Sequence, residues 1–192
     1  MRKFFKLSFL LTAVFAFSLA AAAADTYTID GAHSAANFAV KHMMISTVHG
    51  RFTAVSGTIV FDPADPSKCS VTAVIQSNTI TTDNATRDKH LNSADFFETE
   101  KYPEIRFAST SVRKVGEGQY VAMGNLTIKD VTKQIEVPFT LATGVMQGQK
   151  RLGVESHLKI DRTDYHVNYD PTGVGVAKEV DIELDIEAAQ NK

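Results

Sequence analysis

The chain has 192 residues, with 20 basic and 22 acidic side chains and no block of basic residues. This balance argues against nucleic acid as a partner and against charge-driven docking on an anionic membrane. Cys69 is the only cysteine, which excludes an intrachain disulfide. Its thiol is interpreted as a small buried apolar group rather than as half of an intermolecular bridge.

Residues 1–24 have the pattern of a secretory signal peptide. Three basic residues lie among the first six, a largely apolar run covers residues 7–19, and alanines follow up to Ala24. The run is shorter than the about 20 apolar residues that a membrane-spanning helix needs. Cleavage near Ala24 leaves 168 residues, with 17 basic and 22 acidic side chains and therefore a net charge of −5. We expect a single exported, periplasmic domain over residues 25–192.

The first predicted strand covers residues 33–42. Apolar and polar side chains alternate there with period two, which is the pattern of a strand with one buried face. Because side chains two residues apart point to the same face, Phe38, Val40 and His42 are expected to lie side by side.

The next predicted strand covers residues 48–61 and changes phase along its length. Phe52 belongs to the first phase and Ile59 to the second. A glycine suits an extra residue in one strand of a pair, so we predict a β-bulge or sharp bend at Gly57.

Six further segments alternate in the same way, and with the first two they make eight strands in consecutive antiparallel order. Short turns between such strands are typical of an all-β barrel or sandwich. The long strands and the single long interruption at residues 77–104 favour an eight-stranded antiparallel β-barrel, whose interior holds side chains or one small ligand. The six segments are residues 70–76, 104–110, 119–128, 133–141, 151–160 and 179–188.

The interruption is predicted to form a short helical insertion over one barrel opening, with Asn84 as its N-cap. Phe96 or Phe97 is expected to plug the interior. Arg87 and His90, three positions apart on the helix, are expected at the rim. A long insertion that breaks a regular pattern is usually functional or disordered, and this one has too many apolar anchors to be disordered.

Two adjacent patterns in this region resemble the YceI-like family of periplasmic polyisoprenoid-binding proteins with a lipocalin-like barrel. They are R-D-x-H-L-x-S-x-D-F-F at residues 87–97 and Y-P-x-I-x-F at residues 102–107. The resemblance extends from Tyr27 to about Ala188. The chain departs from the family at Tyr165-His166, where members commonly carry Phe-Gly.

The resemblance implies a carrier that holds a polyisoprenoid, or another long-chain amphiphilic lipid of the fatty-acid kind, and that catalyses no reaction. Arg87, His90 and His42 are the candidates for contact with the polar head group. An equally weighted alternative is that Arg87 pairs with Asp88 or Asp95 and clips the insertion to the barrel. Formation of a homodimer is left open. The candidates for the apolar wall, each of which also suits ordinary core packing, are Phe38, Val40, Phe52, Phe96, Phe107, Ile128, Phe139, Leu158 and Ile182.

The histidines raise an alternative function, a small metal-dependent or hydrolytic enzyme. A zinc site needs three or four ligands that converge on one point. His33 and His42 differ in parity along one strand, and His49 falls on the outer face of the next. We therefore expect these histidines not to form a metal site, and we expect no cofactor.

Overall fold

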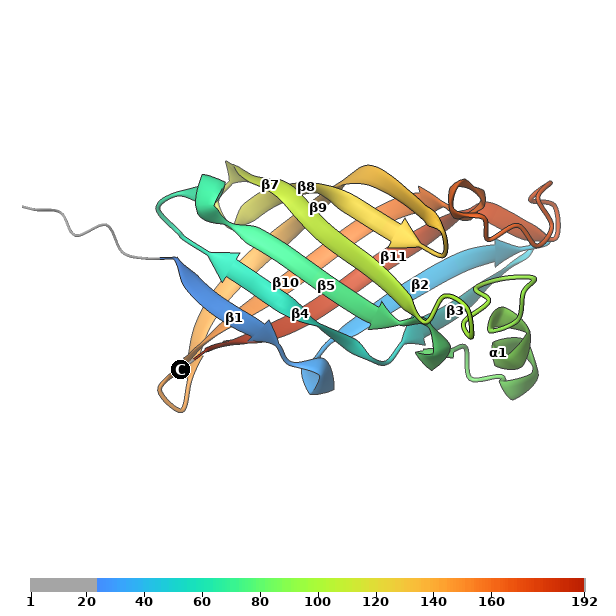
Figure 1. Cartoon of the computed structure of the whole chain (residues 1–192), viewed down its shortest axis with the longest axis horizontal. Helices are drawn as coiled ribbons and strands as arrows, with labels where there is room; N and C mark the ends of the chain where they lie inside the picture. Colours follow the sequence, from blue (N-terminus) through green and yellow to red (C-terminus); the bar gives the residue numbers. More distant parts are fainter. Residues whose placement is uncertain (1–23, 192) are drawn as a thin grey trace, which may run out of the picture.

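The structure is a computed structural model that describes residues 24–191 as an elongated barrel of long, tilted strands (Figure 1). The predicted signal peptide lies, except for its last residue, outside the described residues. The strands are β1 (Asp25–Ile29), β2 (Ala35–His42), β3 (Ser46–Phe52), β4 (Val55–Phe61), β5 (Ser70–Gln76), β6 (Ile80–Thr81), β7 (Glu104–Gly116), β8 (Gln119–Ile128), β9 (Val131–Met146), β10 (Gln149–Asp161) and β11 (Val176–Gln190).

Short helical elements interrupt the strands. The one α-helix of the described part is α1 (Ala85–Leu91), and the 3₁₀ turns are η1 (Gly31–His33), η2 (Pro66–Lys68), η3 (Ser77–Thr79) and η4 (Arg162–Tyr165). Within residues 24–191, no helix combines the length and the apolar character that crossing a membrane would require.

The sheet closes on itself, and the predicted eight-stranded antiparallel barrel is confirmed. Neighbours run in the order β1, β4, β5, β7, β8, β9, β10 and β11, and β11 pairs back onto β1. The N-terminal part of β11, residues 176–185, pairs with β2 and not with β1. β2 in turn pairs with β3, and β3 pairs with β6. β1 with β2, β3 with β4 and β5 with β6 are therefore successive halves of single barrel strands.

The change of phase near residue 57 lies earlier than predicted. β3 ends at Phe52 and β4 begins at Val55, so the break falls at residues 53–54. The backbone N–H groups of both residues donate to the hydroxyl of Thr79, at 3.2 and 3.3 Å, which satisfies donors that a continuous strand would have paired. β4 then pairs with β5 through Gly57 without a register shift, so the predicted bulge at that glycine is wrong.

The helical insertion forms at the predicted place. The side chain of Asn84 accepts the backbone N–H of Arg87 at 3.0 Å, as an N-cap does. Phe96, which follows the helix, is buried, and the ring of Phe97 meets the ring of Phe52 edge-on with 5.5 Å between centroids. The insertion therefore lies at one end of the barrel (Figure 1).

The two ends of the barrel differ in whether residues of the interior wall reach solvent. At the end where β1 begins and β11 ends, inward side chains such as Phe61, Tyr120 and Leu152 are buried. At the α1 end, His42 and His90 are exposed although they belong to the interior wall. The interior is therefore closed at the first end and opens at the second, which we call the mouth.

Candidate functional site: an apolar cavity with a polar mouth

The barrel encloses a cavity of about 450 Å³, within the range of small-molecule pockets. Inward residues of β9 and β11, such as Val137 and Ile182, are only half-buried, because they face this space. The cavity wall is aliphatic and aromatic over nearly its whole extent. It includes every predicted apolar residue: Phe38, Val40, Phe52, Phe96, Phe107, Ile128, Phe139, Leu158 and Ile182. Contact of these residues with a ligand stays a prediction.

Two glycines help to keep the lumen open. Gly50 is paired with Phe38 across β3 and β2, and a Cβ at Gly50 would lie 2.3 Å from the ring of Phe38. On the other side of the barrel, a Cβ at Gly124 would lie 2.4 Å from the ring of Phe107. Both rings therefore occupy space that any other residue would fill, and they lie against the wall.

Arg87 lines the cavity near the mouth, but its partner differs from both predicted carboxylates. Its Nε donates to the hydroxyl of Thr82 at 2.7 Å, and its Nη2 donates to the Thr82 carbonyl at 2.9 Å. Asp88 instead accepts the backbone N–H and the hydroxyl of Thr82, and Asp95 pairs with His90. The predicted Arg87 ion pair is therefore wrong, because buried Thr82 lies between the arginine and Asp88. Nη1 of Arg87 has no hydrogen-bond partner in the described part of the chain.

His90 also lines the cavity, within an aromatic cluster at the mouth. Its ring lies 5.0 Å from the rings of Phe96 and Tyr169, which lie 4.8 Å from each other. Tyr169 was missed because it belongs to the irregular segment between η4 and β11, where no periodic signal exists. His42, the third predicted head-group residue, lies on the cavity wall at the end of β2.

Arg162 is a further charged residue on the cavity wall that the sequence analysis missed. It is buried, and its guanidinium donates to the carbonyl oxygens of Val167, Asp170, Val176 and Ala177 at 2.6–2.9 Å. Desolvation lowers the pKa of this guanidinium. No carboxylate forms an ion pair with it among residues 24–191. Arg162 lies in phase with the inward residues of β10, which is the sequence signal that could have identified it.

The departure from the family pattern lies in the loop that carries Arg162 to the mouth. Tyr165 is buried, and His166 adopts the left-handed conformation with φ 57°, where glycine is favoured. The ring of His166 bonds to Asp130 at 3.0 Å, which lowers the pKa of that carboxyl. Lys129 donates to the carbonyl oxygens of Phe96 and His166, so the insertion, the β8–β9 turn and this loop are tied together.

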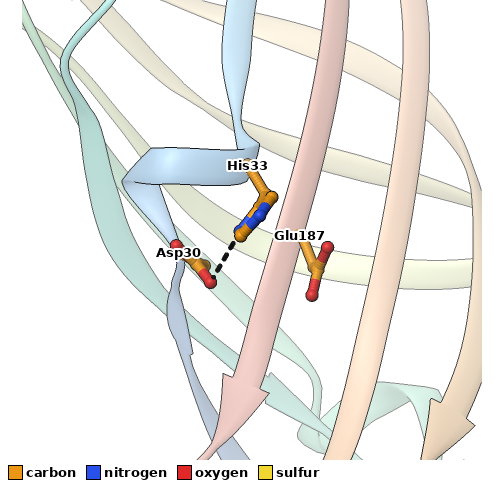
Figure 2. A group of neighbouring side chains, drawn as sticks. All are labelled: Asp30, His33 and Glu187. Atoms are coloured by element: carbon orange, nitrogen blue, oxygen red, sulfur yellow. Dashed lines mark hydrogen bonds and ion pairs between the residues drawn. The ribbon is translucent and has the colours of Figure 1, made fainter. Parts of the chain in front are cut away.

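The three histidines of the metal alternative are not brought together. His42 lines the cavity, and His49 lines a separate groove on the outside of the barrel. His33 lies beside Asp30 and Glu187, as Figure 2 shows, in the one grouping of potential metal ligands among the described residues. Arg151 contacts both carboxylates of this grouping.

The guanidinium of Arg151 already neutralises the Asp30 and Glu187 carboxylates. Its Nη1 lies 3.1 Å from Oδ2 of Asp30 and 2.7 Å from Oε1 of Glu187. A cation would have to displace this guanidinium, so the arrangement is an ion-pair network and gives the enzyme alternative no support.

Comparisons with known proteins agree with this architecture. The family model of the YceI-like domain matches residues 27–188. Protein YceI of Salmonella newport is 37% identical over 185 residues, covering 92% of this chain and 93% of that protein. Protein YceI of Escherichia coli O17:K52:H18 is 38% identical with the same coverage.

Solved structures show the same barrel. The crystal structure of Burkholderia cenocepacia BcnA matches with a TM-score of 0.77 and 25% identity, covering 83% of this chain and 98% of that one. The Campylobacter jejuni YCEI protein matches with a TM-score of 0.72 and 28% identity, over 79% and 90% of the two chains. A Saccharophagus degradans domain, described as polyisoprenoid-binding, matches with a TM-score of 0.68 over 86% and 98%, and its 15% identity establishes a common fold alone. With the family model spanning almost all of the described barrel, the chain belongs to the YceI-like family.

Proposed function

We propose that this protein is a periplasmic carrier that holds a long-chain amphiphilic lipid inside the barrel and catalyses no reaction. The observation that carries the proposal is the apolar cavity of about 450 Å³, which opens at one end and has its charged groups there. Burial of apolar chain contributes roughly 0.8 kcal/mol per methylene, so ten buried methylenes contribute about 8 kcal/mol without any ion pair.

A polyisoprenoid is the first candidate ligand and a fatty-acid-like molecule the second. The Saccharophagus degradans domain with the same fold is described as polyisoprenoid-binding, and this supports the choice only by analogy. The periplasmic location is supported by the signal-peptide pattern of residues 1–24.

The head group is proposed to lie at the mouth. Among residues 24–191, Arg87 and Arg162 line the cavity there without a carboxylate partner, and no group in this range bonds to Nη1 of Arg87. Two arginines in this state favour a head group that accepts hydrogen bonds, because guanidinium groups donate and do not accept. His42 and His90 lie on the same rim.

The test is to identify what the purified protein contains. Native mass spectrometry and extraction with organic solvent are expected to recover a lipid bound one to one, and elemental analysis is expected to show no stoichiometric metal. A protein that carries a metal and no lipid would favour the enzyme alternative. A protein that takes up no long-chain lipid when one is offered would contradict the carrier function.

A further inference from the structure

The turn between β2 and β3 presents three apolar side chains to solvent. Met43, Met44 and Ile45, which we call the apolar tip, are 59%, 70% and 85% exposed. The N–H of Ile45 donates to the carbonyl of His42 at 3.0 Å, and the two residues between them have φ angles of 51° and 58°. Positive φ at both central residues is the signature of a type I′ turn.

Met43 and Met44 in the apolar tip have positive φ angles, a backbone conformation that methionine does not favour. Type I′ turns prefer Asn-Gly, because most side chains are strained at positive φ. The β9–β10 turn, at the closed end, meets the same requirement with Gln147 and Gly148. Of the non-glycine residues with positive φ between residues 24 and 191, only Met43 and Met44 are apolar; the others are Asp83, Glu98, Lys129, Gln147, His166 and Asp170. The tip therefore keeps exposed apolar side chains where a polar pair would be more stable.

The apolar tip lies at the mouth of the cavity. His42, which precedes it, is part of the cavity wall, and the N–H of Met43 donates to the carbonyl of Gly175 at 2.8 Å. The loop that contains Gly175 adds exposed Val174 and Tyr169, at 72% and 43%. Figure 1 shows this loop, the β2–β3 turn and α1 at the same end of the barrel.

We infer that the apolar tip inserts into the surface of a lipid bilayer and so holds the mouth of the cavity against the membrane. A bilayer fits better than a protein partner, because three side chains on a convex turn bury far less than the about 800 Å² per partner of a stable protein interface. The mature chain has a net charge of −5 if cleaved at Ala24, so apolar insertion, not charge, must supply the binding. The inference uses the proposed lipid cargo only as its biological motive, and its test does not depend on it.

The experiment compares flotation of the purified protein with phosphatidylcholine vesicles at about 0.1 M and about 1 M salt, where the Debye length falls from about 10 to about 3 Å. The wild-type protein is expected to float at both. The tip variant Met43→Asn, Met44→Gly, Ile45→Ser is expected to lose about tenfold or more of its binding. Its melting temperature is expected to equal or exceed that of the wild type, because Asn-Gly suits the turn.

A matched control removes exposed apolar side chains from the closed end. Val145 and Met146 are 72% and 59% exposed, and Val145→Ser with Met146→Ser is expected to leave flotation unchanged. The inference is overturned if the wild-type protein does not float, if it floats only at low salt, or if both variants lose binding equally. It is also overturned if the wild type and the control variant are dimers and the tip variant is a monomer, since a second copy of the chain would then cover the tip.

Failure of this inference is distinguishable from failure of the carrier function. Lipid bound inside the barrel is measured on the same samples by native mass spectrometry, without vesicles. A protein that contains a lipid but does not float would support the carrier function and contradict membrane insertion of the apolar tip. A protein that floats through the apolar tip but never contains a lipid would support membrane insertion of the tip and contradict the carrier function.

Discussion

The side chain of Arg87 uses some of its N–H groups to bond within the protein and leaves others without a partner among the described residues. Its Nε and Nη2 bond to buried Thr82, while its Nη1 has no partner in the described chain. Replacement by Ala is therefore expected to lower the free energy of unfolding by about 1–3 kcal/mol, since a buried acceptor is left unpaired. It is also expected to weaken lipid retention beyond what that loss explains. The measurements are urea unfolding and lipid content by native mass spectrometry.

Thr82→Val provides the matched control for Arg87. It removes the hydroxyl that joins Arg87 and Asp88 but leaves the guanidinium at the mouth. If this variant loses as much lipid as Arg87→Ala at equal stability, then Arg87 is a structural clip and does not contact the head group.

Gly50 makes a second prediction at the scale of one residue. A Cβ there would lie 2.3 Å from the Phe38 ring, so Gly50→Ala must push that ring toward the lumen. Overpacking of this kind costs about 1–3 kcal/mol, and if the whole cost falls on the lipid-bound state, the lipid affinity drops by roughly 5-fold to 150-fold. Gly153→Ala is the control, because nothing lies within 4 Å of a Cβ at that position. Unchanged lipid binding by Gly50→Ala would show that the ring relaxes without narrowing the cavity.

At the scale of an element, the segment after β10 contains a buried residue, Tyr165, next to an exposed one, His166. Tyr165→Ala removes a ring that is 2% exposed and is expected to destabilise the protein by about 3–5 kcal/mol. His166→Gly relieves a left-handed φ but loses an exposed contact with Asp130, so its effect is expected within about 1 kcal/mol of zero. Chemical unfolding measures both, and a large loss in His166→Gly would show that the histidine contact holds the loop.

The same loop is predicted to respond to acid. Asp170 accepts hydrogen bonds from the Thr172 hydroxyl and from the N–H groups of Val176 and Gly175, which lower its pKa to about 2. Because the folded-state pKa lies below the unfolded value of about 3.9, this contribution to stability is complete above that value. It is lost as the pH falls from about 4 to about 2.

Asp170→Asn tests that expectation. Urea midpoints of the wild type and the variant are measured between about pH 5 and about pH 2. The wild type is expected to lose stability over this window more steeply than the variant. Parallel curves would show that Asp170 does not couple the loop to pH.

At the scale of the whole molecule, the barrel encloses an apolar cavity whose solvent-exposed wall residues lie at one end. Its wall therefore lacks contacts that a ligand would supply. A ligand that binds only the folded state at about 100 times its Kd stabilises the protein by about 2.7 kcal/mol. Removal of the lipid is therefore expected to lower the melting temperature, and its return is expected to restore it. An unchanged melting temperature after complete extraction would show that the barrel does not depend on its contents.

What the sequence determined by itself is the part of the fold that depends on local alternation. Period two identifies a strand and its inward face without knowledge of its neighbours, so the eight strands and the inward position of the predicted wall residues that lie on strands could be predicted in advance. The Asn84 cap is also local, since donor and acceptor lie three residues apart.

Only the tertiary structure decided the features that depend on which segments meet across space. The phase break moves to residues 53–54 because Thr79, at the end of η3, accepts the freed N–H groups. Arg87 pairs with Thr82 because the insertion folds back on β6, and Tyr169 meets His90 because α1 and the loop before β11 meet at the mouth. Whether the inward face surrounds a filled core or a cavity depends on the closure of the whole barrel, which no local pattern encodes.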